Sequence, residues 1–145
     1  MIQVNSSAFI YRPVKQVFEF ISNLENDFLW QYGILEASRV TEGTTSGVGS
    51  FFRSVGHFMG HRNVSTYEVT DYEFNRKFGF KSISGPLLSH TLYTLEMSNG
   101  CTKLNVSTQA SVTSVIQVNE HVVEKQMKKQ LGENLAMLRQ LLETK

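Results

Sequence analysis

The side chains that could bind a metal ion or act as nucleophiles are few and scattered along the chain. The sequence holds one cysteine, Cys101, and four histidines: His57, His61, His90 and His121. His57 and His61 alone lie close together in the chain, and a metal site would need a third ligand in a fixed geometry. A lone cysteine forms no internal disulfide and fits a small, half-buried strand residue in a reducing compartment. The sequence therefore predicts no metal site and no cofactor.

Hydroxyl and guanidinium groups offer a second kind of chemistry, a proton donor placed near an enolisable carbonyl. The residues that could supply it, if they face inward, are Arg53, Tyr67, Ser82 and Tyr93. A tyrosine at a cavity wall more commonly only places its hydroxyl there. Asp71 and Glu73 would share one face of a strand near its turn, where carboxylates normally sit in water. We therefore assign no catalytic residue.

The length and residue pattern of the chain that carries these residues predict one α+β domain. A length of 145 residues is typical of a single domain and buries roughly two thirds of the surface that the unfolded chain exposes. Alternating apolar residues predict a strand over residues 2–11, and Pro13 then favours a short helix over about 13–22. A second short helix is expected over 25–31, with Trp30 near its end and Gly33 stopping it.

Five to six strands separated by turn residues are expected next, over about 34–42, 48–58, 62–73, 77–84, 89–98 and 101–112. The turns include residues 42–47 and the pair Asn99-Gly100, a strong hairpin signal because both positions need positive φ. The inner face is expected to carry Tyr67, Val69, Phe78, Phe80, Ser82, Thr91, Tyr93, Leu95, Met97, Leu104, Val106 and Ala110. Residues 51–58 alternate ambiguously, so the direction of Arg53 stays undecided.

The last element is a predicted helix over about 119–143 with one continuous apolar stripe. Its members recur every three or four residues: Val123, Met127, Leu131, Leu135, Leu138 and Leu142. Asn119 can cap its first turn, Gly132 is expected to be exposed, and lysines occupy the solvated face. Because such a stripe needs a surface to cover, we predict that the antiparallel sheet curls around this helix.

A single rod-like helix cannot fill the trough of a strongly twisted sheet, so a gap is expected between the two. An apolar gap with a few hydroxyls has the usual make-up of a small-molecule site. The residues expected to contact a ligand are Trp30, Tyr67, Val69, Phe78, Phe80, Tyr93, Leu95, Leu104, Met127 and Leu131, with Trp30 as the gate. The alternative is that these side chains simply close-pack as a core.

Four segments and one tryptophan resemble the START-like (SRPBCC) superfamily, specifically its polyketide cyclase/dehydrase and lipid-transport branch. They are IYRPVKQVFEFI at 10–21, GVGSFFR at 47–53, YEVTDYE at 67–73, RKFGF at 76–80, and Trp30. The glycine-threonine pair common after the sixth strand of that family is interrupted here, as Gly100-Cys101-Thr102. The resemblance implies a helix-grip fold of six to seven strands over residues 1–145, with a deep hydrophobic cavity. It implies no catalytic residue, because the matched motifs shape turns and start a helix.

The leading hypothesis for function is a module that binds a small hydrophobic or amphipathic molecule, such as a lipid or an aromatic polyketide. The alternatives are a metal-free cyclase or dehydratase acting in the same cavity, and a regulatory domain that binds a partner protein. The charged outer face of the last helix counts against the regulatory domain.

The composition of the chain limits which partners and which cellular location are expected. The chain has 14 basic and 13 acidic residues, so no net field would attract nucleic acid. It shows neither a signal peptide nor an apolar run long enough to span a membrane, so a cytoplasmic location is expected. A monomer is expected, or a weak homodimer formed through an unprotected first or last strand.

Overall fold

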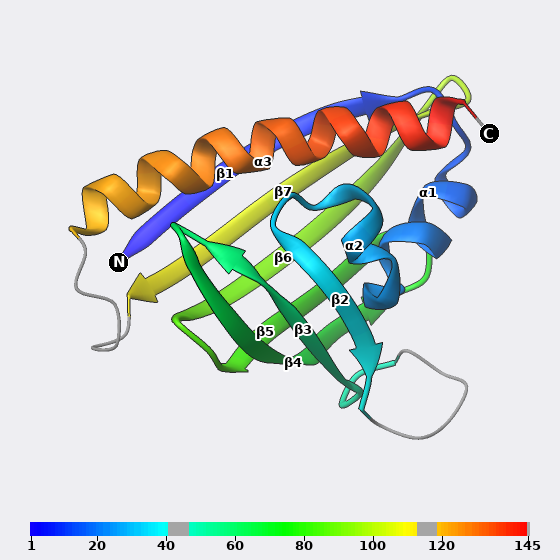
Figure 1. Ribbon diagram of the computed structural model, residues 1–145. Coiled ribbons are helices and arrows are strands. Elements are labelled where there is room, and N and C mark those ends of the chain that lie inside the picture. Colours follow the sequence, from blue (N-terminus) through cyan, green and yellow to red (C-terminus); the bar gives the residue numbers. More distant parts are fainter. Residues whose placement is uncertain (41–46, 113–118, 145) are drawn as a thin grey trace.

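A computed structural model describes residues 1–40, 47–112 and 119–144. The elements in chain order are β1 (Ile2–Ile10), α1 (Val14–Ile21), the 3-10 turn η1 (Leu24–Asn26), α2 (Asp27–Trp30), β2 (Ile34–Arg39), β3 (Phe51–Phe58), β4 (His61–Glu73), β5 (Lys77–Ser84), β6 (Leu87–Ser98), β7 (Cys101–Val112) and α3 (Glu120–Glu143). In Figure 1 the sheet curves below α3, which runs along β1.

The seven strands form one antiparallel sheet in the order β1-β7-β6-β5-β4-β3-β2. This arrangement, with two short helical segments after β1 and the long helix at the end, confirms the predicted helix-grip α+β fold. The expectation that the last strand is an edge was wrong. Because β1 pairs with β7 along its whole length, β7 lies inside the sheet and the two edges are β1 and β2.

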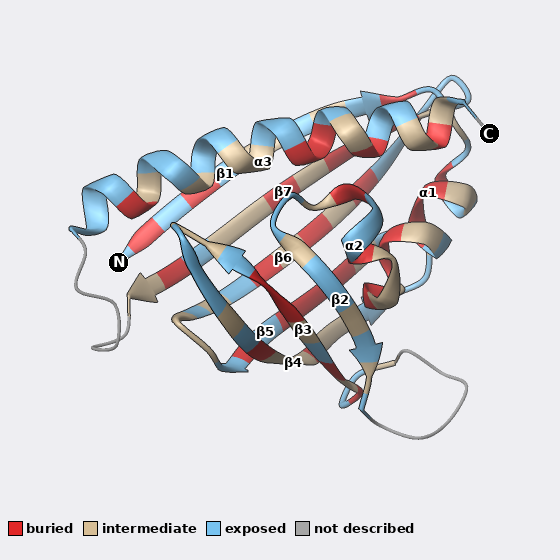
Figure 2. Cartoon of the chain, viewed as in Figure 1, coloured by how far each residue is buried: buried red, intermediate tan, exposed pale blue. Residues whose placement is uncertain are grey.

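The predicted inner face is confirmed for most of the sheet, and the buried residues alternate along most of β6 and β7 (Figure 2). In β5 Phe78, Phe80 and Ser82 are buried as predicted, together with Gly79 between them. Met97 is the exception, since 75% of it is exposed. The pairing explains the error, because β5 begins opposite Thr94 and the end of β6 projects beyond it. In β3 the structure resolves the ambiguity: Phe52 is buried, whereas Arg53 points outward and is exposed.

The second predicted helix is shorter than expected and divided in two. Asn23 Oδ1 accepts a hydrogen bond from Glu25 N at 3.1 Å and so starts η1, and α2 follows directly and ends at Trp30. Phe28 and Leu29 are exposed, while Trp30 is 2% exposed. Within the described residues β2 stops at Arg39, and the predicted turn over residues 42–47 lies mostly outside the described part of the chain.

The helix α3 follows its prediction closely, and Asn119 Oδ1 caps it by accepting a hydrogen bond from His121 N at 2.8 Å. Leu135, Leu138 and Leu142 are fully buried against the sheet. Met127 and Leu131, nearer the start of the helix, are only half-buried. No helix in the described ranges is both long and apolar enough to cross a membrane.

Tyr11 and Arg12, which directly follow β1, connect the C-terminal end of α3 to the sheet. The Arg12 guanidinium donates a hydrogen bond to the backbone oxygen of Glu143 at 2.5 Å, and the Thr102 hydroxyl donates to the backbone oxygen of Arg12 at 2.8 Å. Tyr11 N also donates to the Glu143 carboxylate at 2.9 Å, which lowers the pKa of Glu143. These hydrogen bonds therefore join one end of β1, one end of β7 and the C-terminal end of α3.

Two glycine substitutions are expected to change stability in opposite directions. Gly100 has φ +78° in the β6–β7 turn and Gly132 lies in α3, and an added Cβ meets no atom within 4 Å at either position. Gly100→Ala should lose about 1 kcal/mol because of its left-handed backbone, whereas Gly132→Ala should gain about 1 kcal/mol from helix propensity. Denaturant unfolding of both variants measures this. Equal signs would contradict the described backbone at one of the two positions.

Candidate functional site

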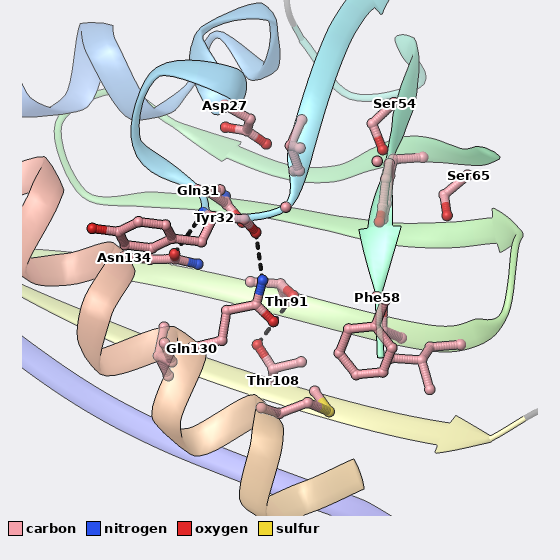
Figure 3. A pocket seen from close by; sticks show the side chains of 18 of the residues that line it. Asp27, Gln31, Tyr32, Ser54, Phe58, Ser65, Thr91, Thr108, Gln130 and Asn134 are labelled. Carbon is pink, nitrogen blue, oxygen red and sulfur yellow. Dashed lines mark hydrogen bonds between the residues drawn. The ribbon is translucent and has the colours of Figure 1, made fainter. Parts of the chain in front are cut away.

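A cavity of about 220 Å³ lies between the sheet, α2 and α3 (Figure 3). It separates two apolar clusters of the interior. The larger cluster includes Phe18, Phe78 and Leu138, and the smaller one includes Val4 and Val123. Leu131 packs against both clusters and lines the cavity. The gap predicted between helix and sheet is therefore present, and it lies at the end where α3 is only half-buried.

The predicted contact residues divide into two groups. Six of them line the cavity: Trp30, Tyr67, Phe80, Tyr93, Met127 and Leu131. The other four belong to the close-packed core outside the lining: Val69, Phe78, Leu95 and Leu104. Close packing, the alternative considered for all ten residues, thus describes these four. The six lining residues stay predicted ligand contacts.

Aromatic rings form one wall of the cavity. Tyr67 and Phe80 meet edge to face with ring centroids 5.5 Å apart, and Phe80 and Tyr93 meet in the same way at 5.8 Å. Trp30 lies 6.3 Å from Tyr93. Behind this layer, Phe78 stacks on Tyr93 at 6.3 Å and 21°. Edge-to-face and stacked contacts of this kind fix the positions of the rings, so the wall is pre-formed.

This wall also contains a buried acid that sequence patterns did not indicate. Asp27 is 7% exposed and lines the cavity, and its Oδ1 has no hydrogen-bond partner among the described residues. Burial raises the pKa of Asp27 well above the ordinary value of 3.8, and the nearby Gln31 and Trp30 side chains offset this in part. In the sequence Asp27 follows Glu25 and two asparagines, and nothing distinguishes it from them.

Two tyrosine hydroxyls share the cavity with Asp27. Tyr93 is 2% exposed, and its hydroxyl accepts a hydrogen bond from Gln31 Nε2 at 3.4 Å. Burial, followed by the neighbouring Asp27 carboxyl, raises the pKa of Tyr93 well above its ordinary value. Burial also raises the pKa of Tyr67, against the effect of hydrogen bonds from Ser65 and Ser54. In all three groups burial therefore disfavours the charged form.

The mouth of the cavity is formed where α3 meets the connection between α2 and β2. Asn134 Oδ1 accepts a hydrogen bond from Tyr32 N at 2.8 Å, and Gln130 Nε2 donates to the backbone oxygen of Tyr32 (Figure 3). Tyr32 is 47% exposed, whereas Trp30 is buried in the wall. Trp30 as the gate stays a prediction, and Tyr32 is the more exposed of these two lining residues. Gln130 and Asn134 lie one turn apart beside the apolar stripe, a spacing visible in the sequence.

The backbone of β2 and β3 closes one side of the mouth through a close approach of two glycines. A Cβ built on Gly56 would lie 2.1 Å from the backbone oxygen of Gly33. That oxygen accepts a hydrogen bond from His57 N at 2.7 Å. Gly33, predicted only to stop a helix, has φ +87°, and a Cβ built on it would lie 2.6 Å from the backbone oxygen of His57, so this close approach to β3 requires glycine at position 33 as well.

The remaining candidates for chemistry lie elsewhere or have structural roles. Arg53 is exposed, and Ser82 holds the β5–β6 turn by donating to Leu87 O at 2.8 Å and accepting from Ser89 N at 2.8 Å. Asp71 accepts a hydrogen bond from the Thr70 hydroxyl at 2.9 Å and lies 3.8 Å from the exposed His90. In the described ranges no three His, Cys, Asp or Glu side chains are grouped closely enough to hold a metal ion.

Comparison with solved structures shows which known fold this chain has. No protein-family model matches the sequence, and no curated protein matches it either. Among solved structures, a START superfamily protein from Mycobacterium smegmatis superimposes with a TM-score of 0.84 at 14% identity, covering 98% of this chain and 97% of that one. The chain has the START-like fold.

Two other solved structures from different bacteria superimpose on this chain over nearly its whole length. The protein TTHA0849 from Thermus thermophilus has a TM-score of 0.82 at 16% identity, with 98% of this chain and 97% of that chain covered. The Zhui aromatase/cyclase from Streptomyces sp. R1128 has a TM-score of 0.78 at 12% identity, with 97% and 93% covered. These identities are low, so the comparison establishes the START-like fold and leaves the function to the site itself.

Proposed function

We propose that the protein binds a small amphipathic molecule in the cavity between the sheet and α3. The observation that carries this proposal is a buried acid, Asp27, with an unpartnered oxygen in a cavity that has a wall of aromatic rings. Apolar walls with a few convergent polar groups are the usual make-up of small-molecule sites. Apolar burial, worth about 25 cal/mol per Å², would drive binding, and the polar groups would orient the molecule.

The size of the cavity limits the ligand. Its volume of about 220 Å³ is below the roughly 300–1,000 Å³ of sites for drug-sized ligands. A compact molecule of one or two rings therefore fits better than a long-chain lipid. 2-Acetylnaphthalene combines two aromatic rings with one carbonyl and serves as a test ligand. Trp30 is the only tryptophan and lines the cavity, so its fluorescence reports on binding.

Filling part of the cavity should weaken binding without unfolding the protein. We expect 2-acetylnaphthalene to quench Trp30 fluorescence in a saturable way, and we expect Leu131→Phe to weaken binding at least about tenfold by occupying part of the space. Leu88→Phe makes the same change at an exposed position of β6 and should bind as the wild type does. Thermal unfolding shows that both variants are folded. Equal affinity of all three proteins, or no saturable quenching in the wild type, would contradict the proposal.

A second candidate, a cyclase or dehydratase type of enzyme, draws support from the three acidic groups in one cavity. The aromatase/cyclase among the similar structures has the same fold. Enolisation needs a base as well as an acid, however, and His57 at the exposed mouth is the only histidine among the described lining residues. Hydrogen–deuterium exchange at the methyl group of 2-acetylnaphthalene, catalysed by the wild type and reduced by Tyr93→Phe, would favour this candidate over simple binding.

A further inference from the structure

Three acidic hydroxyl groups converge on the cavity from three different elements. Asp27 comes from α2, Tyr93 from β6 and Tyr67 from β4, and all three line the same space. Asp27 and Tyr93 are both more than nine-tenths buried. The placement is fixed by packing, since the ring of Tyr93 is held between Phe78 and Trp30. The polar end of the cavity is therefore rigid.

These groups lie close enough to affect one another, yet none is the hydrogen-bond partner of another. Asp27 raises the pKa of both tyrosines through space. The Tyr93 hydroxyl accepts a hydrogen bond from Gln31, and Asp27 Oδ1 has no hydrogen-bond partner among the described residues, although the Gln31 and Trp30 side chains lie near the carboxyl and partly offset the rise of its pKa. A buried polar atom without a partner is costly, so a ligand atom that completes its bonding is favoured there.

The charges of the side chains that line the cavity limit which kind of ligand atom can bind beside Asp27. The described lining contains no lysine and no arginine, so a carboxylate ligand would be buried without a counter-ion. Burial without a lysine or arginine in the lining likewise disfavours the ionised form of Asp27, and a carboxyl that carries its proton donates a hydrogen bond. The tyrosine hydroxyls are donors as well. The polar end of the cavity therefore presents donors to an uncharged acceptor.

We propose that Asp27 and Tyr93 together donate hydrogen bonds to one uncharged oxygen of the ligand, a ketone or aldehyde carbonyl, and that the cavity rejects carboxylates. This inference rests on the proposed function and adds the chemical class of the ligand. The carbonyl oxygen would lie at the Asp27 end, and the ring system would lie on Phe80, Leu131 and Met127. Asp27 is then the residue that determines specificity.

Four ligands with the same ring system test this selectivity: naphthalene, 2-acetylnaphthalene, 2-naphthoate and 2-(aminomethyl)naphthalene. We expect the wild type to bind the ketone about tenfold more tightly than naphthalene, and to bind 2-naphthoate at least tenfold more weakly than the ketone. Asp27→Leu should remove the advantage of the ketone over naphthalene, and Asp27→Asn should keep much of it, because an amide N–H donates to the carbonyl. Asp71→Asn, on the outer face of β4, is the matched control.

The pH dependence of the affinity for the ketone distinguishes a donated hydrogen bond from a loss of packing, because a loss of packing would weaken binding equally at every pH. As pH rises through the raised pKa of Asp27, the carboxyl ionises and loses its donated proton, so the affinity of the wild type for the ketone should fall. With Asp27→Asn the affinity should not change over the same range. The other titratable side chains in the described lining are Tyr32, Tyr67, Tyr93 and His57. Uncharged polar side chains complete the lining: Gln31 directly after α2, Ser54 of β3, Asn63 and Ser65 of β4, Ser89 and Thr91 of β6, Thr108 of β7, and Gln130 and Asn134 of α3.

The outcomes separate this inference from the proposed function. If naphthalene and the ketone bind equally well and Asp27→Leu changes neither, the carbonyl site is refuted while the binding cavity stands. If the amine binds more tightly than the ketone and its affinity rises with pH, Asp27 binds as a carboxylate and the inference is overturned. If none of the four ligands binds, the proposed function fails and the inference fails with it.

Discussion

Replacing Asp27 with asparagine is expected to stabilise the protein at neutral pH. The carboxyl is buried, and its Oδ1 has no partner in the described structure, so the native state disfavours its ionised form. Asparagine has nearly the same shape and carries no charge. We expect Asp27→Asn to raise the free energy of unfolding by about 1–3 kcal/mol at pH 8, the usual cost of an unsatisfied buried polar group.

The sign of the pH dependence follows from linkage. Because the pKa of Asp27 is raised on folding, the native state binds its proton more tightly than the unfolded state does. The stability of the wild type should therefore fall as pH rises from 3.8, the ordinary value for aspartate, through the raised native pKa. The advantage of Asp27→Asn should shrink towards zero at pH 4.

Urea unfolding of the wild type and the variant between pH 4 and pH 8 measures this difference. Asp71→Asn, which removes a half-buried carboxyl from the outer face, is the matched control and should not show the same trend. An Asp27→Asn protein that is less stable than the wild type at every pH would mean that Asp27 accepts strong hydrogen bonds as a carboxylate. Such a result would also remove the basis for a neutral donor in the cavity.

Truncating Phe78 is expected to have the largest effect on stability of any substitution considered. Phe78 is 0% exposed, and its ring meets those of Tyr93 at 6.3 Å, Phe80 at 6.0 Å and Tyr72 at 6.2 Å. Phe78→Ala removes this packing and leaves a hole beneath the aromatic wall, at a cost of about 3–5 kcal/mol. Guanidinium chloride unfolding gives the value.

Phe28→Ala is the matched control, because Phe28 on α2 is 50% exposed. Its effect should stay within about 0.5 kcal/mol. Phe78 was predicted from the sequence as a ligand contact, and the structure places it one layer behind the cavity. If Phe78→Ala costs no more than Phe28→Ala while it weakens ligand binding, Phe78 contacts the ligand and the packing described here is incorrect.

The elements of the fold could be predicted because their signals are local. Asn99 and Gly100 have φ of 49° and 78°, as their turn requires, and the stripe of α3 from Val123 to Leu142 follows the helical period. The segment around Arg12 that resembles the START-like superfamily also has a structural role, since Arg12 connects the end of β1 to the end of α3. Where alternation was ambiguous, in β3, only the pairing with β4 fixed Phe52 as the inward residue.

The site could be predicted only in part because its properties arise from tertiary packing. Five residues of its wall, Tyr67, Phe80, Tyr93, Met127 and Leu131, were predicted from strand and helix periodicity, and Trp30 was predicted as its gate. The burial of Asp27 was not predicted, since it depends on how a four-residue helix packs against β2 and α3, and no pattern within the segment encodes that. For the same reason the sequence did not show that Phe78 and Leu104 lie in the core while Leu131 borders the cavity.

The most direct test of the account is a ¹⁵N NMR titration of the protein with 2-acetylnaphthalene. The single indole N–H signal belongs to Trp30, whose Nε1 is buried without a hydrogen-bond partner in the described structure, next to the cavity. We predict a saturable shift of this signal, together with shifts of the backbone amides of Tyr32, Phe58 and Leu131. A titration that leaves these four signals in place, or that shifts only residues on the outer face of the sheet such as Asn5 and Asn105, would contradict a ligand site inside the helix grip.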